Sequence, residues 1–462
     1  MIIPARPAPC NVSSCSRPSI ATRTFHLRAR GTILQNTTQR MILLGGLAVV
    51  LLAASPSAAA TAATADTLTH VVQRGDNLHE LASRYKSEAG WYSLTDCLHA
   101  IRSANGMEDR DLLRPGDTLR VPVAPEAANV MVTDPVQAGA NLRGLYLPAH
   151  ACSRRTVFDR VDRFVEVGGN GVIFDAKDID GGLSFRSQQP LASYGVGCYG
   201  PSIPDLPAFV QRLKQRDVWV VARLALFLDG RLGYQRPDLA LHDSTGAIWA
   251  ERDCAWMDPD QPEVRDYNLG LALELAQAGV DEIQVDYVRF PTNGWRGDWQ
   301  GDVEGTATRR RGIITNFVAT LHDSLRARDC HLSASIFGIA AWGRTEDLAL
   351  TGQHVPSLAS HLDVVCPMIY PSHFEPGFEG LDQPANYPEL VITAGVERCR
   401  NMAGAGLLVR PWLQAFAWRV DDYDGDYVRA QIQAATGAGA SGWSLWNPAG
   451  RYGVASAALL TP

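Results

Sequence analysis

Apolar runs of strand length alternate with amphipathic helical stretches from residue 142 to the end of the chain. Eight runs have strand character: 142–148, 171–176, 218–227, 282–290, 332–337, 363–370, 409–416 and 442–446. Helical periodicity falls between them, at 156–167, 204–215, 262–278, 308–326, 387–403 and 427–438. Eight β/α repeats in about 310 residues favour a closed (β/α)8 TIM barrel, an α/β fold, over a doubly wound sheet. The first run is not followed by GxGxxG, which also argues against a dinucleotide-binding fold.

A smaller unit precedes the barrel at residues 69–123. Its pattern predicts a strand at 70–73, a helix ending near Tyr85, a second helix at 96–105 and a strand at 118–122. Asp76, in the turn Arg74-Gly75-Asp76, is the expected N-cap of the first helix. The segment is therefore a small βααβ module.

One long apolar run, residues 41–54, lies near the N-terminus. It is shorter than the roughly 20 residues of a membrane span, follows Arg40 and leads into the small-residue stretch 58–60. This order indicates a signal peptide within an N-terminal extension, residues 1–60, whose true start is Met1 or Met41. The alternative is a single-pass anchor. We expect an exported, cell-wall-associated protein, periplasmic or extracellular, with no stable membrane span after cleavage.

Residues 124–140, small and Ala/Pro-rich, form a linker to the barrel domain, 141–462.

Charge and residue usage exclude some classes of function. The net charge is −7, and the chain after residue 60 has no long basic run, so nucleic acid is not an expected partner. Neither HExxH nor a clustered His/Asp set is present, and the cysteines form no CxxC pair. We therefore expect no metal and no cofactor.

Asp286 is the leading catalytic candidate. Alternation along EIQVDYVRF, residues 282–290, places Glu282, Gln284 and Asp286 on one face. Active sites of TIM barrels lie at the carboxyl ends of the strands, where an inward-facing Asp286 would open onto the pocket. Its carboxylate needs a partner, for which Arg289 and Lys177 are the candidates. The alternative role is a structural ion pair.

A second polar cluster, Asp175, Lys177 and Asp178, follows the second strand. Asp175 and Lys177 share strand parity, so both are expected at the mouth. An ammonium group beside Asp175 would lower the pKa of its carboxyl, which suits a nucleophile or general base. A structural salt bridge is the alternative.

Other strand ends carry polar and aromatic residues that suit sugar binding, since sugar rings stack on aromatic faces. The substrate-binding candidates are Lys177, Arg289, Tyr370, His373, Trp412, Gln414, Trp446 and Asn447.

The 69–123 module resembles the LysM family. The matching residues are Val72, Gly75, Asp76, Leu78, Leu81, Ala82, Asn105, Leu113, Pro115, Gly116 and Leu119. The resemblance implies a shallow groove for glycans that contain N-acetylglucosamine, such as peptidoglycan. The stretch SEAGWYSLTDC, between the helices, is longer than usual.

The barrel resembles a bacterial family of glycoside-hydrolase-like TIM barrels classed as a domain of unknown function. The motifs are FDAKDIDG (174–181), ARLALFLD (222–229), DEIQVDYVRFP (281–291), SIFG (335–338), DVVCPMIYPSHF (363–374), RPWLQAF (410–416) and SGWSLWNP (441–448). Chitinase-like barrels are similar more distantly, through Met368-Ile369-Tyr370 and Trp446. Val288 stands where they carry a glutamate acid, so their substrate-assisted mechanism does not transfer. Strand five also lacks the terminal glutamate of amylase-like barrels, which leaves Glu346, in the following loop, as a substitute.

Three functions fit these features. The first is a glycoside hydrolase that acts on an envelope or extracellular polysaccharide and is targeted by the LysM module. It would use two carboxyl groups, Asp286 and one of Asp175, Asp178 or Glu346. The second is a non-catalytic carbohydrate-binding envelope protein with a degenerate barrel, and the third is a transglycosidase or lyase.

Overall fold

The computed structural model describes residues 67–85, 89, 94–108, 112–123, 139, 141–154, 156–195, 200–292, 294–295, 297 and 302–460. The predicted signal peptide and all of the predicted linker except residue 139 lie outside the described residues. Among the residues described, no helix has both the length and the apolar composition of a membrane span.

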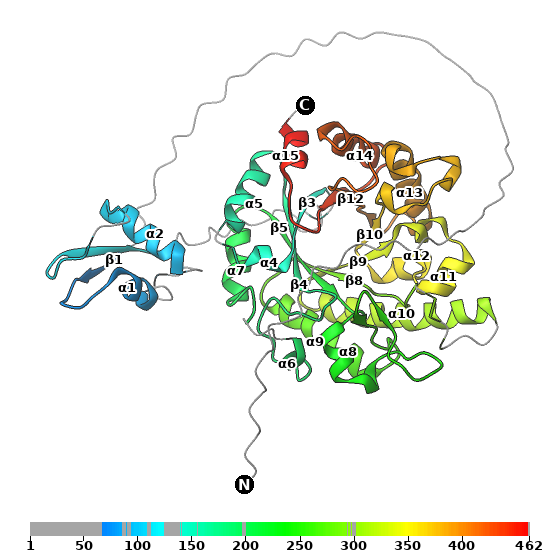
Figure 1. Ribbon diagram of the computed structural model, residues 1–462, viewed down its shortest axis with the longest axis horizontal. Helices are drawn as coiled ribbons and strands as arrows, with labels where there is room; N and C mark the ends of the chain where they lie inside the picture. Colours follow the sequence, from blue (N-terminus) through cyan, green and yellow to red (C-terminus); the bar gives the residue numbers. More distant parts are fainter. Residues whose placement is uncertain are drawn as a thin grey trace, which may run out of the picture. The chain divides into compact units, whose positions relative to one another are not determined.

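The N-terminal module has the predicted βααβ order (Figure 1). Strands β1 (Thr67–Val71) and β2 (Thr118–Pro122) pair antiparallel, and helices α1 (Leu78–Tyr85) and α2 (Leu94–Asn105) lie between them in sequence. Asn105 links α2 to β2, because its side-chain amide donates to the Arg120 carbonyl at 2.7 Å and its oxygen accepts from the Arg120 amide at 2.9 Å.

The predicted cap of α1 is wrong by one residue. Asn77 accepts the Glu80 amide at 2.9 Å and caps the helix. Asp76 instead accepts the Gln73 amide at 2.7 Å and pairs with His70 at 2.7 Å. The carboxylate of Asp76 therefore accepts a hydrogen bond within the turn that precedes the helix. Asn77, the next polar residue, satisfies a free amide of the first helical turn.

Eight parallel strands close into the predicted barrel, and the helices form a ring outside them (Figure 1). The strands are β3 (Leu142–Leu147), β4 (Gly171–Lys177), β5 (Trp219–Ala225), β8 (Glu282–Asp286), β9 (His331–Phe337), β10 (Val364–Met368), the pair β11 (Leu408–Val409) and β12 (Trp412–Gln414), and β13 (Gly442–Trp446). Pairing of β9 with β10, and of β13 with β3, closes the ring. The seventh strand is interrupted at Arg410 and Pro411, since proline has no amide hydrogen to donate to a neighbouring strand.

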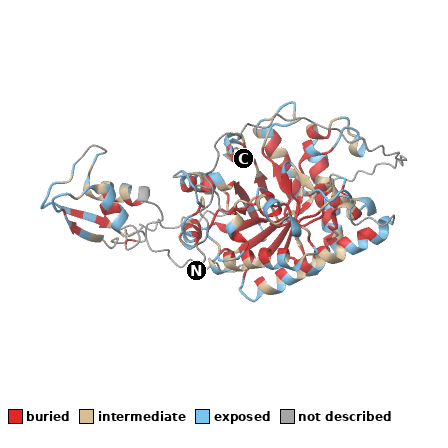
Figure 2. Ribbon diagram, turned by 60° about the horizontal axis from the view of Figure 1, so that its bottom comes forward, coloured by how far each residue is buried: buried red, intermediate tan, exposed pale blue. Residues whose placement is uncertain are grey.

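Six of the longer helices lie where helical periodicity was predicted, whereas the last helix, the shorter helices and a two-stranded hairpin were not predicted. The longer helices are α5 (Val157–Glu166), α7 (Leu206–Lys214), α9 (Pro262–Gln277), α10 (Val303–Arg326), α13 (Pro388–Ala403), α14 (Gly425–Gly437) and α15 (Gly453–Leu460). Shorter elements include α4 (Ala149–Cys152), α6 (Ala192–Gly195), α8 (Gly230–Gln235), α11 (Thr345–Thr351), α12 (Val355–Leu358) and the hairpin β6 (Ala250–Glu251) and β7 (Cys254–Ala255). Figure 2 shows the strands buried and the helices exposed on their outer faces.

Alternation along β8 is as predicted, because Ile283 and Val285 pack in the outer core while Glu282, Gln284 and Asp286 face the interior of the barrel. Glu282, at the amino end of the strand, pairs with the fully buried Arg410 and accepts from the Trp219 indole at 3.0 Å. The interior of the barrel thus holds an ion pair far below the strand ends where Asp286 lies.

Replacing Arg410 with methionine is expected to lower the free energy of unfolding by about 3–5 kcal/mol, because the Glu282 carboxylate would remain buried without its ionic partner. Chemical denaturation measures the change. Adding Glu282→Gln to the same variant should restore most of the loss, and a single variant as stable as the wild type would contradict this account of the interior.

Candidate active site

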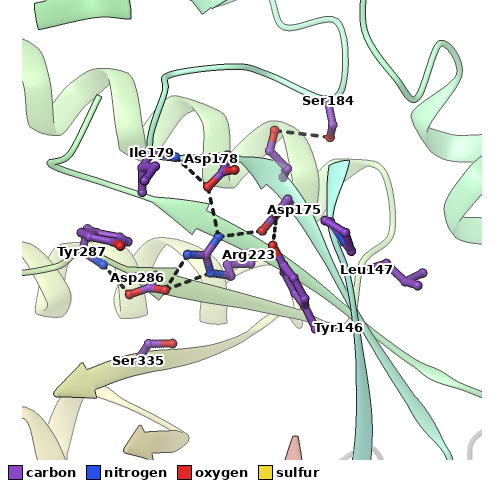
Figure 3. A network of polar contacts seen from close by, with 12 residues as sticks. Tyr146, Leu147, Asp175, Asp178, Ile179, Ser184, Arg223, Asp286, Tyr287 and Ser335 are labelled. Carbon is purple, nitrogen blue, oxygen red and sulfur yellow. Dashed lines mark hydrogen bonds and ion pairs between the residues drawn. The ribbon is translucent and has the colours of Figure 1, made fainter. Parts of the chain in front are cut away.

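Arg223 connects the ends of three neighbouring strand–loop segments. It lies on β5, and its guanidinium donates to Asp175 of β4 at 2.6 Å and to Asp286 of β8 at 2.7 and 2.9 Å (Figure 3). A third carboxylate, Asp178, lies 3.8 Å from the same guanidinium. Burial opposes the positive charge, yet Asp286 and Asp175 hold the pKa of Arg223 well above its ordinary value. We call Arg223, Asp175, Asp178 and Asp286 the carboxylate network.

Asp175 is the buried member of this network. Its side chain is fully buried and accepts a hydrogen bond from the Tyr146 hydroxyl on β3 (Figure 3). Burial raises the pKa of Asp175 to about 6, although Arg223 acts in the opposite direction. The predicted lowering of this pKa is therefore wrong, because the loss of hydration outweighs the attraction of the neighbouring cation.

Lys177 does not lie at the mouth, contrary to the prediction from strand parity. The pairing of β4 with β5 shifts register between Asp175 and Lys177, and this irregularity reverses the side on which later side chains fall. The ammonium group of Lys177 is sealed beneath the β5–α8 loop, 2.8 Å from Asp229 and 3.1 Å from the Asn268 amide oxygen. It neither pairs with Asp286 nor is open to a substrate.

Asp286 ends β8, and its side chain keeps 8% of its surface exposed. One carboxylate oxygen binds Arg223, and the other accepts the Tyr287 amide at 2.7 Å (Figure 3). Tyr287 has a positive φ of 49°, so the chain turns sharply directly after the carboxylate. The predicted partner Arg289 instead stacks on Phe337 at 4.3 Å and on Trp256 at 4.7 Å, because the turn directs it toward the hairpin β6–β7.

Asp178 is the exposed member of the network, with 46% of its side chain accessible. Its Oδ1 accepts the Ile179 amide at 2.8 Å (Figure 3). Since Asp178 and Asp286 both contact one planar guanidinium, their nearest oxygens lie within roughly 9 Å of each other. Two-carboxylate glycosidases hold their carboxyl groups about 5–5.5 Å apart for retention and about 6.5–9.5 Å apart for inversion, so this pair does not exceed the upper limit of those separations.

Glu346 lies outside the network. It is exposed in the first turn of α11, and none of the contacts among the described residues joins it to Arg223. Of the three predicted partners for Asp286, the structure brings Asp175 and Asp178 to the same guanidinium.

An aromatic wall, which we define as Tyr370, His373, Phe416, Trp418 and Trp446, stands beside the network. Tyr370 stacks on the partly exposed Trp446 with a centroid distance of 5.1 Å, and Phe416 meets Trp446 edge to face at 5.3 Å. Tyr370 belongs to the same buried cluster as Tyr146, which places this ring near the network. Burial, followed by the charge of Asp286, raises the pKa of the Tyr370 hydroxyl. Tyr370, His373 and Trp446 were predicted, whereas Phe416 and Trp418 were not among the candidates.

Three predicted substrate contacts are occupied within the protein. Trp412 is buried in the barrel interior and donates to the Ser335 hydroxyl at 3.1 Å. Gln414 is fully buried and accepts the Ser372 amide at 3.1 Å while it donates to the Phe416 carbonyl at 2.9 Å. Asn447 donates to the Ala415 carbonyl and holds the turn after β13. Gln414 and Asn447 thus position loops beside the aromatic wall, and Trp412 packs inside the barrel.

Sequence reasoning missed Arg223 and Tyr146. One signal for Arg223 was present, because a single arginine interrupts an otherwise apolar strand, WVVARLA.

Among the described residues, no group of three or more His, Cys, Asp or Glu side chains is arranged to hold a metal ion.

The raised pKa of Asp175 predicts that stability depends on pH. The folded state binds this proton up to about pH 6, whereas the unfolded chain releases it near its ordinary pKa, so the folded state holds more protons between pH 4 and 6. The contribution of Asp175 to the free energy of unfolding is therefore full at low pH. This contribution falls by about 3 kcal/mol as the pH rises through 6. Denaturant unfolding of the wild type and Asp175→Asn between pH 4 and 7 measures this difference. If the free energy of unfolding changed equally with pH in both proteins, the prediction would be contradicted.

Comparisons with known proteins agree with the fold. A family model described as "Putative glycosyl hydrolase domain" matches residues 144–452, and one described as "LysM domain" matches residues 70–122. The chain is similar in structure to the PgaB (BpsB) glycoside hydrolase domain from Bordetella bronchiseptica, with 16% identity, a TM-score of 0.51 and coverage of 69% of this chain and 98% of that one. At this identity the likeness shows the fold alone.

A hypothetical protein from Ruminiclostridium thermocellum ATCC 27405 is 26% identical, with a TM-score of 0.35 and coverage of 41% of this chain and 96% of that one. No curated protein matches the chain. The two domain matches imply glycan binding. Because the first family model spans about two thirds of the sequence, the chain belongs to that glycosyl hydrolase domain family and carries a LysM domain ahead of its barrel.

Proposed function

We propose that the barrel hydrolyses glycosidic bonds of a cell-envelope or extracellular polysaccharide. One observation carries the proposal: two carboxyl groups that reach solvent, Asp178 and Asp286, share one guanidinium at the carboxyl end of a closed barrel. Hydrolysis of a glycosidic bond commonly needs two such groups, one that donates a proton and one that attacks or activates water.

The surroundings of the two groups suggest their roles. Arg223 contacts one oxygen of Asp286 at 2.7 Å, and a carboxyl group placed at the end of a strand beside a guanidinium suits a nucleophile or a base for water. Asp178 is open to solvent and would protonate the glycosidic oxygen as the bond to the anomeric carbon breaks. Asp175 and Tyr146 would act as positioning residues, since both hold the arrangement around Arg223 and neither faces solvent.

The proposal includes the location of the protein and the role of its N-terminal domain. The signal peptide predicted within residues 1–60 would export the chain, and the LysM domain would hold it on peptidoglycan or another glycan that contains N-acetylglucosamine. A location in the cell envelope suits both domains.

One observation favours the non-catalytic alternative. Only 8% of the Asp286 side chain is exposed, and Arg223 already contacts one of its oxygens. A barrel that binds glycan without cleaving it would keep the aromatic wall and the LysM domain but need no access to this carboxylate.

Release of reducing ends from a panel of peptidoglycans and bacterial polysaccharides separates the two functions. The wild-type chain is expected to release them from at least one glycan, and the Asp178→Asn/Asp286→Asn double variant is expected to bind that glycan without cleaving it. If the wild type binds glycans from the panel and releases no reducing ends, the barrel is a binding domain.

A further inference from the structure

Trp418 is an exposed tryptophan on the loop that follows the seventh strand. Strand β12 ends at Gln414, and Trp418 comes four residues later, at the carboxyl end of the barrel where the active sites of this fold lie. Of the tryptophans in the described part of the chain, Trp418 is the most exposed, with 41% of its surface accessible. A large apolar ring therefore faces water at the end of the barrel where a substrate enters.

The backbone around Trp418 is held by a buried side chain. Gln414 is fully buried, and its amide group donates to the Phe416 carbonyl at 2.9 Å and to the Trp418 carbonyl at 3.3 Å. Its oxygen accepts the Ser372 amide at 3.1 Å, which ties this loop to the loop after β10. Because these bonds fix the loop before a ligand arrives, a sugar that stacks on Trp418 would need little further ordering of the protein.

The next residue, Arg419, supports the tryptophan ring itself. Its guanidinium lies over Trp418, 4.6 Å from the ring centroid, and donates to the Ser372 carbonyl at 3.4 Å. Glu375 lies 3.3 Å from the same guanidinium, so a carboxylate balances the positive charge. The Arg419–Glu375 pair has no net charge, and the surroundings of Trp418 therefore favour an uncharged ligand.

Trp418 is the outer end of the aromatic wall. His373 lies next to it with a centroid distance of 5.1 Å, and Tyr370 lies on the other side of His373 at 5.1 Å. Tyr370 shares a buried cluster with Tyr146, which donates to Asp175 of the carboxylate network. Within the described ranges, no ring contact or polar contact joins Trp418 to the network directly. The rings thus lead outward from the network, with His373 and Tyr370 between it and Trp418.

We propose that Trp418 stacks on an uncharged pyranose ring of the polysaccharide, at least one sugar unit away from the bond at the carboxylate network. The apolar C–H face of a pyranose suits the flat face of an indole ring. Because the two sites are separated along the wall, one chain must extend from the network to Trp418, so the barrel binds chains more tightly than disaccharides. This inference rests on the proposed function only in taking a glycan as the ligand of the mouth. It requires binding and not cleavage.

Fluorine NMR of the full chain, labelled with fluorotryptophan, tests this proposal. Trp418→Phe and Trp446→Phe identify the signals of the outer and inner tryptophans of the wall, and the Asp286→Asn background prevents turnover. The probes are the disaccharide and the hexasaccharide of the cello, malto and chito series, which are all uncharged. We expect at least one hexasaccharide to shift the signals of both Trp418 and Trp446, at a concentration about tenfold below that at which its disaccharide shifts the Trp418 signal.

Substitutions of Trp418 then measure its contribution, with the Trp446 signal as the readout. Trp418→Ala is expected to weaken binding of that hexasaccharide about tenfold, whereas Trp418→Phe keeps a flat apolar face and should retain most of the affinity. Tyr234→Ala is the matched control and should bind as the parent does. Tyr234 is 52% exposed on α8, which follows β5, and β5 lies four places from β12 in the ring of eight strands.

Four results would overturn the proposal. They are no shift of the Trp418 signal with any hexasaccharide, a shift of Trp418 without one of Trp446, equal binding of the disaccharide and the hexasaccharide, and equal affinity of Trp418→Ala and Tyr234→Ala. Absence of hydrolysis by the wild type would refute the proposed function and leave these titrations intact.

Discussion

Replacing Asp286 with asparagine is expected to lower the rate of glycan hydrolysis by about 10²–10⁴-fold while glycan binding is retained. Asparagine has the same shape and can still accept the Tyr287 amide, but it lacks the charge needed to attack an anomeric carbon or to take a proton from water. Initial rates of reducing-end release, with binding measured on the same glycan, give the two quantities.

Asp180→Asn is the matched control for this variant. Asp180 lies in the loop after β4, its side chain is 56% exposed, and it pairs with Arg231 at 3.0 Å, away from Arg223. This control should turn over at the wild-type rate. If Asp286→Asn is as active as Asp180→Asn, the carboxylate of β8 has no part in catalysis.

Replacing Arg223 with methionine is expected to abolish hydrolysis and to lower the free energy of unfolding by about 3–5 kcal/mol at pH 7. The variant would leave Asp175 and Asp286 buried and facing each other without the cation that both contact. The loss should be smaller at pH 5, because two carboxylates that lack a cation take up protons more readily. Denaturant unfolding at the two pH values measures both effects.

A triple variant separates stability from chemistry at this site. Adding Asp175→Asn and Asp286→Asn to Arg223→Met removes the unpaired charges, so stability should largely return while hydrolysis stays absent. An Arg223→Met protein that loses less than about 1 kcal/mol would mean that the guanidinium does not hold the three strand ends together.

The barrel could be predicted from the sequence because each of its strands is a buried apolar run. Runs such as WVVARLA and the alternating EIQVD have few interpretations other than strands enclosed by helices. Asp286 could be placed for the same reason, since inward direction and position at the strand end follow from counting residues along a regular strand.

Counting fails where a strand is irregular. The register shift in β4 lies between two residues of the same parity, and it separates Asp175, which faces Arg223, from Lys177, which faces Asp229. The pattern of apolar residues does not indicate such a register shift, because both sides of a barrel strand are buried.

Electrostatic surroundings were also beyond the sequence. The expected lowering of the Asp175 pKa assumed an exposed carboxylate beside an ammonium group, whereas the residue is fully buried and its pKa rises to about 6. Burial depends on residues distant in sequence, such as Tyr146 on β3. The same reason explains why Gln414 and Asn447, polar residues at strand ends, position loops instead of substrate.

Chemical rescue tests the central claim most directly, once the glycan panel has supplied a substrate. In Asp286→Ala the carboxylate is replaced by space at the mouth, into which azide can enter. Our account predicts that azide restores turnover and that part of the product is a glycosyl azide, because the small anion attacks the anomeric carbon from the place of the missing group. Turnover by Asp286→Ala that equals the wild-type rate without azide would contradict the account.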